Sequence, residues 1–271
     1  IGFVPYYLIV STNKDYAIEA TFLFTMVATL IVLFMALLLK NTSVYDPYWS
    51  VAPFVMTILH MFFVSGFTAN AIIINIIVFW YAFRLTRNWI ITYKGLDRKY
   101  EDWRYADFRK NLPTWQFQFV NIFGLVYVPT IVVYASLIPA LYLMNSAFNA
   151  LSIIGFALMI AGPVLEIISD YQVHKFIKDT NDHSKVCNYG LWNYSRHPNY
   201  LGELTFWFGI MVAFLVTGPS NWYAGLGFIL MVILFLAASI PLMEKHNISR
   251  RPAYQEYKNN TSVLFILPKK K

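Results

Sequence analysis

The sequence has a single cysteine, Cys187, and only 13% of its 271 residues are charged. One thiol excludes an intramolecular disulfide framework, and it excludes zinc or iron–sulfur sites built from several cysteines. Five histidines are too few for the histidine-rich metal centre of a membrane hydroxylase. We therefore expect a protein without a bound metal.

Hydrophobic residues make up 58% of the chain and its mean hydropathy is +0.51. Soluble domains are about 45–50% apolar and about 25% charged, so this composition indicates an integral membrane protein. The same figures exclude a disordered, collagen-like or nucleic-acid-binding chain. The sequence starts at Ile1 without a recognisable signal peptide, and we expect a trimmed N-terminus.

Seven stretches are long and apolar enough to form membrane-spanning helices, because about 20 residues cross the hydrocarbon core. They cover residues 18–39, 51–67, 68–83, 119–143, 147–169, 202–217 and 222–243. Pro129 and Pro139 fall in the fourth stretch, where a membrane helix tolerates them with a kink. The sequence predicts one all-α, seven-helix membrane domain over residues 1–271.

Positive charge is sorted between alternate loops of this scheme. Of the 21 Lys and Arg residues, 20 lie in segments 40–50, 84–118, 170–201 and 244–271, and Lys14 alone lies on the other side. Cytoplasmic loops collect Lys and Arg, so the N-terminus is predicted outside and the C-terminus inside. The membrane would be the inner membrane of a bacterium or the endoplasmic reticulum of a eukaryote.

Several ionisable residues lie at membrane depth or at the inner ends of the predicted spans. They are Glu166, Asp170, Glu203, Glu244 and His246. Such residues are costly in lipid and are candidates for a functional site. Glu166 and Asp170 are four residues apart and share a helix face. The cluster predicts a polar site at the cytoplasmic mouth of the bundle; buried ion pairs with loop arginines are the alternative interpretation.

No dinucleotide-binding fingerprint accompanies this cluster. The glycines at 225 and 227 lie inside a predicted span, and Leu230 stands where a third glycine would be. Because no strand precedes them, they indicate helix packing rather than a Rossmann fold.

The segment 190–203 concentrates groups that bind a nucleotide, and reads Gly-Leu-Trp-Asn-Tyr-Ser-Arg-His-Pro-Asn-Tyr-Leu-Gly-Glu. The guanidinium of Arg196 suits a phosphate. The carboxamide of Asn199 can exchange hydrogen bonds with a primary amide. Phosphates together with a nicotinamide would use both groups.

This segment resembles the signature of the steroid 5α-reductase superfamily, and specifically its bacterial-type branch long described as a domain of unknown function. Further similarities follow in order along the chain, in segments 46–50, 84–87, 101–105, 169–172, 241–245 and 251–257. The resemblance implies a seven-helix reductase that takes hydride from NADPH without a Rossmann fold. It also implies a steroid-like or other lipid substrate that arrives from the bilayer, and an active site facing the cytoplasm.

Positions carried over from the resemblance define the expected NADPH site. They are Asp170, Arg196, His197, Asn199, Tyr200, Glu203, His246 and Arg250. Asn199 and Glu203 would lie nearest the nicotinamide amide, with Arg196 and His197 beside the phosphates.

Hydride addition to the β-carbon of an enone builds negative charge on the carbonyl oxygen, which a hydrogen-bond donor must stabilise. The resemblance places this donor at Tyr81, supported by a carboxylate for which this chain offers Asp46. His60 is the next candidate partner. A tyrosine of the interfacial aromatic belt is the alternative interpretation of Tyr81.

Two other functions remain open. Membrane methyltransferases of isoprenylcysteine carboxyl groups share the Arg-His-Pro element and use S-adenosylmethionine, but they carry paired glutamates where this chain has Glu244 alone. A non-catalytic sterol- or lipid-binding membrane protein is the third possibility. The sequence favours the NADPH-dependent reductase of an activated carbon–carbon double bond.

Overall fold

The computed structural model describes residues 2–182 and 184–269, and these residues form helices without a named strand. The α-helices are α1 Phe3–Thr12, α2 Ala17–Leu39, α3 Tyr45–His60, α4 Ala69–Thr92, α5 Trp103–Asn111, α6 Thr114–Phe119, α7 Val128–Met144, α8 Ser152–Thr180, α9 Pro198–Leu215, α10 Gly227–Leu234, α11 Ile240–Arg250 and α12 Tyr254–Asn260. An isolated β-bridge joins Ser195 to Ser262.

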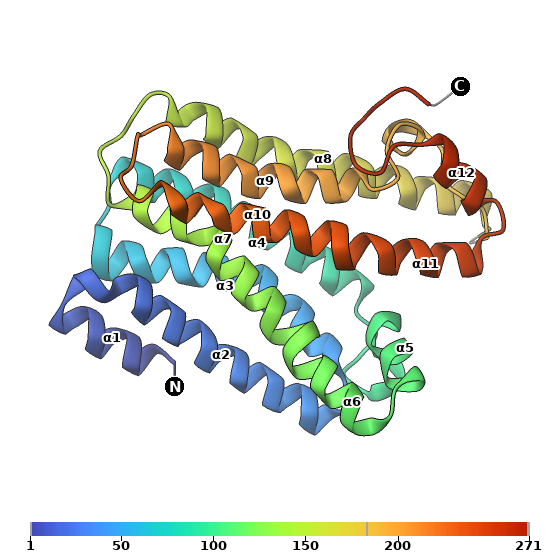
Figure 1. Cartoon of the computed structure of the whole chain (residues 1–271), viewed down its shortest axis with the longest axis horizontal. Helices are drawn as coiled ribbons and strands as arrows, with labels where there is room; N and C mark the ends of the chain where they lie inside the picture. Colours follow the sequence, from blue (N-terminus) through green and yellow to red (C-terminus); the bar gives the residue numbers. More distant parts are fainter. Residues whose placement is uncertain (1, 183, 270–271) are drawn as a thin grey trace.

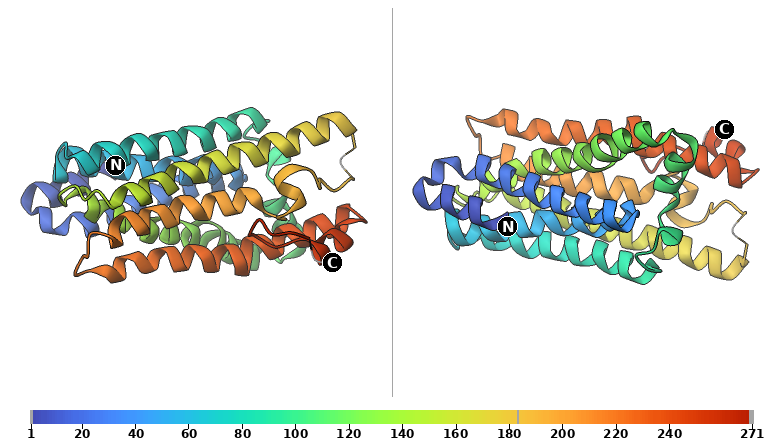
Figure 2. Two further views of the ribbon diagram at one scale, coloured as in Figure 1. Left: turned by 90° about the horizontal axis from the view of Figure 1, so that it is seen from above. Right: turned by 90° about the horizontal axis from the view of Figure 1, so that it is seen from below.

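The long helices run side by side along one axis (Figures 1 and 2). Three π-helical segments extend or join them without a break: Met61–Ser65 after α3, Val120–Tyr127 between α6 and α7, and Phe235–Ser239 between α10 and α11. Six of the resulting helices are long and apolar enough to cross a membrane: Lys14–Leu39, Thr42–Ser65, Ala69–Thr92, Thr114–Met144, Ser152–Thr180 and Trp222–Arg250. The prediction of an all-α, multi-pass membrane protein is confirmed at this level.

The remaining predicted span, 202–217, forms most of α9 and is not one of these six apolar helices. The first two turns of α9 carry Asn199 and Glu203, which lower its apolar content. Several of its large side chains point inward, since Phe206 and Trp207 are fully buried. Because neighbouring helices cover much of α9, fewer of its residues would contact lipid. Its sequence can therefore be less apolar than that of a lipid-facing helix.

The N-terminal helix α1 was absent from the sequence prediction, which began its first helix at residue 18. α1 is a ten-residue apolar helix that folds back on α2. Tyr6 and Val10 of α1 are buried with Ala17 and Ala20 at the start of the next helix. This small cluster anchors the N-terminal segment against the bundle.

The connections that carry most of the predicted inside charge gather at one end of the bundle. Figure 1 shows α5, the segment after α8 and the tail with α12 at this end. The turns after α7 and α9 lie at the opposite end. Segments 84–118, 170–182, 184–201 and 244–269 thus meet in space although they are far apart in sequence.

Helices α8 and α9 approach each other at glycines spaced seven residues apart. A Cβ atom on Gly162 would lie 2.5 Å from the carbonyl oxygen of Gly202, and one on Gly209 would lie 2.6 Å from the amide nitrogen of Met159. Small residues of this kind let membrane helices pack backbone to backbone. The close approach places Glu166 of α8 directly against the first turns of α9, because a Cβ on Gly202 would lie 2.5 Å from its Cγ.

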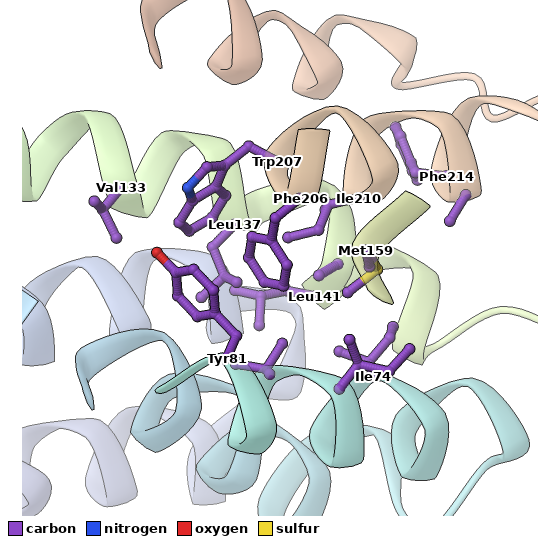
Figure 3. Packing of buried hydrophobic residues seen from close by; sticks show 14 of the residues in the cluster. Ile74, Tyr81, Val133, Leu137, Leu141, Met159, Phe206, Trp207, Ile210 and Phe214 are labelled. Carbon is purple, nitrogen blue, oxygen red and sulfur yellow. The ribbon is translucent and has the colours of Figure 1, made fainter. Parts of the chain in front are cut away.

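The centre of the core is aromatic (Figure 3). The Tyr81 ring of α4 stacks on Phe206 of α9, with ring centroids 4.0 Å apart and planes 4° from parallel. Trp207 meets both rings edge to face. These contacts fix the side-chain position of Tyr81, whose exposed fraction is 0%.

Replacing Gly209 with valine is expected to destabilise the bundle by about 1–3 kcal/mol, because the added side chain meets the backbone of α8. The measurement is the apparent melting temperature in detergent. Gly124→Ala is the matched control, since its added Cβ would have only Val120 Cγ1 at 3.8 Å as a neighbour. Equal melting temperatures for the two variants would contradict the close helix approach.

Candidate functional site

A cavity of about 480 Å³ lies toward the α5 end of the bundle. Most of its polar residues come from α4, α8 and α9, which form its polar wall, and most of its apolar residues come from the Thr114–Met144 and Trp222–Arg250 helices, which form its apolar wall. The polar residues are Asp46, Arg84, Asn88, Arg104, Glu166, Asp170, Asn199 and Glu203. The apolar residues include Trp49, Leu125, Pro129, Val133, Met231, Leu234 and Phe235.

A second cavity of about 270 Å³ adjoins the first. The two share four wall residues, namely Trp103, Asn199, Tyr200 and Met243. The second wall adds Lys185, Arg196, His197, His246, Asn247 and Arg251. Of the ten predicted site residues, all except Tyr81 and Arg250 line one of these cavities, and Asn199 and Tyr200 line both.

Tyr81 forms its hydrogen bond with Glu203, and not with Asp46. The phenol oxygen lies 2.5 Å from Glu203 Oε1, and Trp207 Nε1 donates to the same oxygen at 2.8 Å. Glu203 borders the main cavity and Tyr81 lies directly behind it. The buried carboxylate therefore receives two donors from the aromatic core, on α4 and on its own helix.

Arg84 of α4, one turn after Tyr81, pairs with both Glu166 and Asp170 of α8. Sequence analysis placed Arg84 only in a motif and gave it no role at the site. Its position one helical turn from Tyr81 was the available signal, because residues three apart share a helix face. The pairing gives a cationic partner to the two acidic residues of α8 that the sequence had placed on one face.

Two buried oxygens of this wall have no hydrogen-bond partner among the described residues. They are Glu166 Oε1 and Asn199 Oδ1. An unpaired buried acceptor costs about 1–3 kcal/mol. Both residues line the main cavity, so a ligand with N–H or O–H donors bound there would satisfy them.

The expected pair of Tyr81 with Asp46 is not formed. Asp46 Oδ1 accepts a hydrogen bond from Tyr105 at 2.6 Å, and its other oxygen lies 3.4 Å from Arg104. His60, the other candidate partner, lies 3.0 Å from Asn145. The sequence could not rank these partners, because the distance from Tyr81 to each depends on how the helices pack.

Tyr105 joins the α5 helix to the membrane-spanning part of the chain. Burial raises the pKa of its phenol well above the usual value, and the nearby Asp46 carboxylate raises it further. Tyr105 therefore stays protonated and donates to Asp46 throughout the ordinary pH range. This contact holds α5 over the α3 side of the main cavity.

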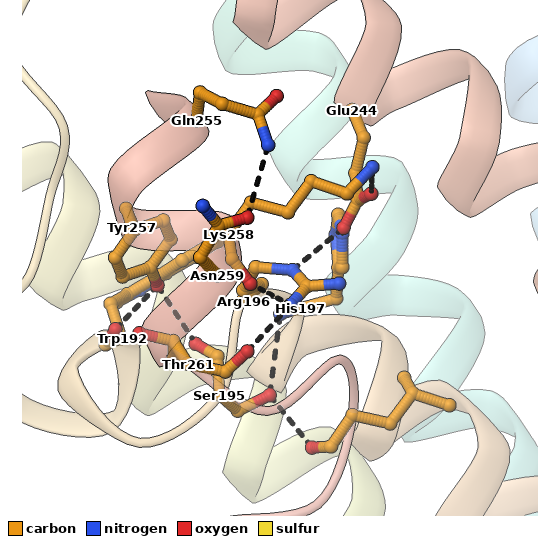
Figure 4. A network of polar contacts seen from close by, with 11 residues as sticks. Trp192, Ser195, Arg196, His197, Glu244, Gln255, Tyr257, Lys258, Asn259 and Thr261 are labelled. Atoms are coloured by element: carbon orange, nitrogen blue, oxygen red, sulfur yellow. Dashed lines mark hydrogen bonds and ion pairs between the residues drawn. The ribbon is translucent and has the colours of Figure 1, made fainter. Parts of the chain in front are cut away.

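Arg196 and His197 belong to a buried network that docks the C-terminal tail (Figure 4). Arg196 Nε donates to Glu244 Oε1 at 2.7 Å, and its Nη1 donates to the carbonyl oxygens of Lys258 and Thr261 at 2.7 and 2.5 Å. His197 Nε2 lies 3.4 Å from the same Glu244 oxygen. Two of the three guanidinium nitrogens are thus committed to protein partners, although the sequence predicted Arg196 beside phosphates.

His246 and Arg250 lie on successive turns of α11. The His246 ring stacks on Trp103 with centroids 3.5 Å apart, so it closes the shared boundary of the two cavities. Arg250 is exposed, and its Nη1 lies 3.4 Å from His246 Nε2. Among the described residues no group of three or more His, Cys, Asp or Glu side chains is placed to hold a metal.

Arg196→Ala is expected to destabilise the protein by about 1.5–3 kcal/mol, because it removes a charged hydrogen bond to Glu244 and leaves two tail carbonyls without their donor, while Glu244 keeps Lys258 at 2.8 Å. It should also release the tail, so that limited proteolysis cuts between residues 251 and 264 much faster than in the wild type. Lys245→Ala, at an exposed position on α11 next to Glu244, is the control. A tail that stays resistant in Arg196→Ala would contradict its role as the docking residue.

The chain is similar to a protein family and to a fungal protein. A family described as a protein of unknown function, DUF1295, matches residues 32–261. The uncharacterized protein C594.04c of Schizosaccharomyces pombe is 25% identical over 258 residues, which cover 83% of this chain and 73% of that protein. No solved structure matches the chain. The family match extends over most of the chain, from α2 to the end of the docked tail, and the chain therefore belongs to the DUF1295 family.

Proposed function

We propose that this protein is an NADPH-dependent reductase of an activated carbon–carbon double bond in a steroid-like or other lipid enone, related to the steroid 5α-reductases. The main support is a single cavity that is polar on one wall and apolar on the other. A cofactor and a lipid have opposite solubilities, and this cavity offers each a matching surface. The resemblance of segment 190–203 supplies the identity of the cofactor.

The residues of the polar wall suit a nicotinamide. Asn199 Oδ1 is a buried acceptor without a partner, and a carboxamide N–H group satisfies such an atom. Glu203 offers a carboxylate on the same helix, one turn further on. His197, His246 and Lys185 line the adjoining cavity, which would take the phosphate-bearing part of the cofactor. Asp170 and Tyr200 complete the proposed wall, and Arg196 would act mainly by holding it in place.

Bound NADPH would supply the hydride for the β-carbon of the acceptor. The protein's part is to polarise the acceptor carbonyl and to provide a proton for the adjacent carbon. We assign this part to the pair of Glu203, which lines the cavity and would contact the acceptor, and Tyr81, which lies behind Glu203 and would supply its proton through their hydrogen bond. Stacking on Phe206 holds the phenol in place, which limits the reorganisation required during the reaction.

The proposal includes seven spans, with α9 as the sixth, an outside N-terminus and an inside C-terminus. The sorting of Lys and Arg supports this orientation, and the charged connections share one end of the bundle. The cofactor cavity would then face the cytoplasm, which holds NADPH. The membrane would be a bacterial inner membrane or the endoplasmic reticulum.

Cofactor choice separates the reductase from the methyltransferase alternative. NADPH at about 100 times its dissociation constant should stabilise the folded protein by about 2.7 kcal/mol, whereas S-adenosylmethionine should not. The measurement is a thermal shift in detergent, with NADH and NADP⁺ for comparison. Stabilisation by S-adenosylmethionine alone would overturn the reductase. NADPH binding without loss of its absorbance, when lipid enones are supplied, would favour a non-catalytic lipid-binding protein.

Tyr81→Phe is expected to remove enone reduction and to leave the NADPH dissociation constant within about twofold of the wild type, because the phenol lies behind the cofactor wall. Asn199→Ala and Glu203→Gln should weaken NADPH binding and thereby abolish turnover. The measurements are NADPH titration by fluorescence and single-turnover oxidation with a Δ4-3-oxosteroid. Tyr223→Phe is the control, because Tyr223 is exposed and lines neither cavity. Loss of both binding and reduction in Tyr81→Phe would contradict its assignment as proton donor.

A further inference from the structure

A groove between α11 and α12 shares no wall residue with either cavity of the candidate site. Its volume is about 320 Å³, and it lies at the end of the bundle that carries the charged connections. It is lined by Pro241, Glu244, Lys245, Ile248 and Lys258. The first four belong to α11 and the last to α12, and no other described element borders it. A hollow between two neighbouring helices is a surface groove rather than an enclosed cavity.

The two lysines of the α11–α12 groove are held differently. Lys258 Nζ lies 2.8 Å from Glu244 Oε2, and Figure 4 shows its side chain reaching this carboxylate. Glu244 is itself buried, and its other oxygen accepts a hydrogen bond from Arg196 at 2.7 Å. Lys258 is therefore fixed at the groove by a contact with the tail-docking network. Lys245 is exposed and forms no ion pair with any described residue.

Positive charge exceeds negative charge at this groove. Glu244 is the one carboxylate among its described wall residues, and Arg196 and Lys258 both pair with it. Lys245 adds a further cation without a counter-charge. Because a lysine ammonium has three N–H donors, Lys258 keeps donors free for a ligand while it contacts Glu244. The groove is thus suited to an anion that bridges the two lysines.

The position of Lys245 along the last span places the groove at the level of the lipid headgroups. Residues 222–243 contain no charged side chain, and Glu244 and Lys245 follow directly. About 20 apolar residues cross the hydrocarbon core, so the apolar stretch ends where these two residues begin. Lysines that flank such a stretch meet the headgroup region, and anionic headgroups attract them.

Apolar side chains continue from the groove toward the hydrocarbon core. Pro241, one turn before Lys245, lines the groove and is exposed. Ile233 and Leu236, on the preceding turns of the same span, are also exposed. A ligand that joins an anionic group to an acyl chain would contact both the lysines and these apolar side chains. A soluble phosphate would use the lysines alone, and the continuity with the lipid-facing surface therefore favours a lipid.

We propose that the α11–α12 groove binds an anionic glycerophospholipid. Its phosphate would lie between Lys245 and Lys258, and one acyl chain would follow the last span toward Leu236. The bound lipid would contact α11 and α12 together, at the point where the chain turns into its docked tail. This site is independent of the proposed reductase, since no residue of the groove lines the cofactor or substrate cavities.

The test uses the whole protein in detergent, titrated with dioleoyl phosphatidylglycerol or dioleoyl phosphatidylcholine, and native mass spectrometry counts the bound lipids. We expect the wild type to hold one phosphatidylglycerol more tightly than phosphatidylcholine. Lys245→Ala should weaken phosphatidylglycerol binding about fivefold, because one lysine beside an anionic headgroup contributes roughly this factor. Lys245→Arg should retain the binding, since a guanidinium also pairs with phosphate. Circular dichroism reports the folding of each variant.

Lys175→Ala is the matched control. It removes the same charge from an exposed position near the C-terminal end of α8, outside the groove. We expect it to leave the affinity for phosphatidylglycerol unchanged. Ile248→Glu is a second groove variant, which adds a negative charge at an exposed position and keeps both lysines. It should weaken phosphatidylglycerol binding and leave phosphatidylcholine binding unchanged, so the test does not depend on a single substitution.

Equal affinity of the wild type for the two lipids would overturn the proposal, and so would equal losses in Lys245→Ala and Lys175→Ala. Phosphatidylglycerol binding that persists in Lys245→Ala or in Ile248→Glu would place the lipid elsewhere and would also overturn it. Inorganic phosphate is the competing probe. Its release of the bound lipid at millimolar concentration would assign the groove to a soluble phosphate instead of a lipid. The measurement contains neither NADPH nor an enone, so its result does not depend on the reductase.

Discussion

The structure depends on the burial of two carboxylates, Glu166 and Glu203, inside an apolar helix bundle. Isolated charges in such surroundings cost several kcal/mol, and they persist only with hydrogen bonds and opposite charge. Arg84 pairs with Glu166, while Tyr81 and Trp207 contact Glu203. The glycine contacts between α8 and α9 make this arrangement possible, because they bring the two carboxylate-bearing helices together at backbone distance.

The Arg196-His197 element before α9 has a structural role that its residue types alone do not indicate. Arg196 binds Glu244 and two carbonyl groups of the tail, and the β-bridge of Ser195 to Ser262 lies beside it. This network fixes the start of α9, the end of α11 and the tail relative to one another. The second cavity lies among the same elements, so its shape depends on the network even where a ligand would not touch it.

Hydropathy and charge predicted the membrane class and the clustering of charged loops, because both depend on composition along the chain. They did not predict the short helix α1 or the three π-helical segments, which have no compositional signature. Eight of the ten proposed site residues line the cavities, and five of these eight lie in the continuous signature segment 190–203, so their proximity could be predicted from the sequence. The partner of Tyr81 was wrong because it lies 122 residues away on another helix, and only packing brings the two together.

The two walls of the main cavity follow from the same packing. On the polar wall, Arg84 pairs with the carboxyl groups of Glu166 and Asp170, and Glu203 receives its two hydrogen bonds from Tyr81 and Trp207. Glu166 Oε1 and Asn199 Oδ1 have no hydrogen-bond partner among the described residues, so this wall has more acceptors than its own donors satisfy. A ligand that brings N–H or O–H donors to this wall gains hydrogen bonds that the protein cannot make for itself. The opposite wall is apolar and includes Val133, Met231 and Leu234. A polar, donor-bearing ligand and a lipid are thus each favoured by a different wall of one cavity, which is the arrangement that a reaction between them requires.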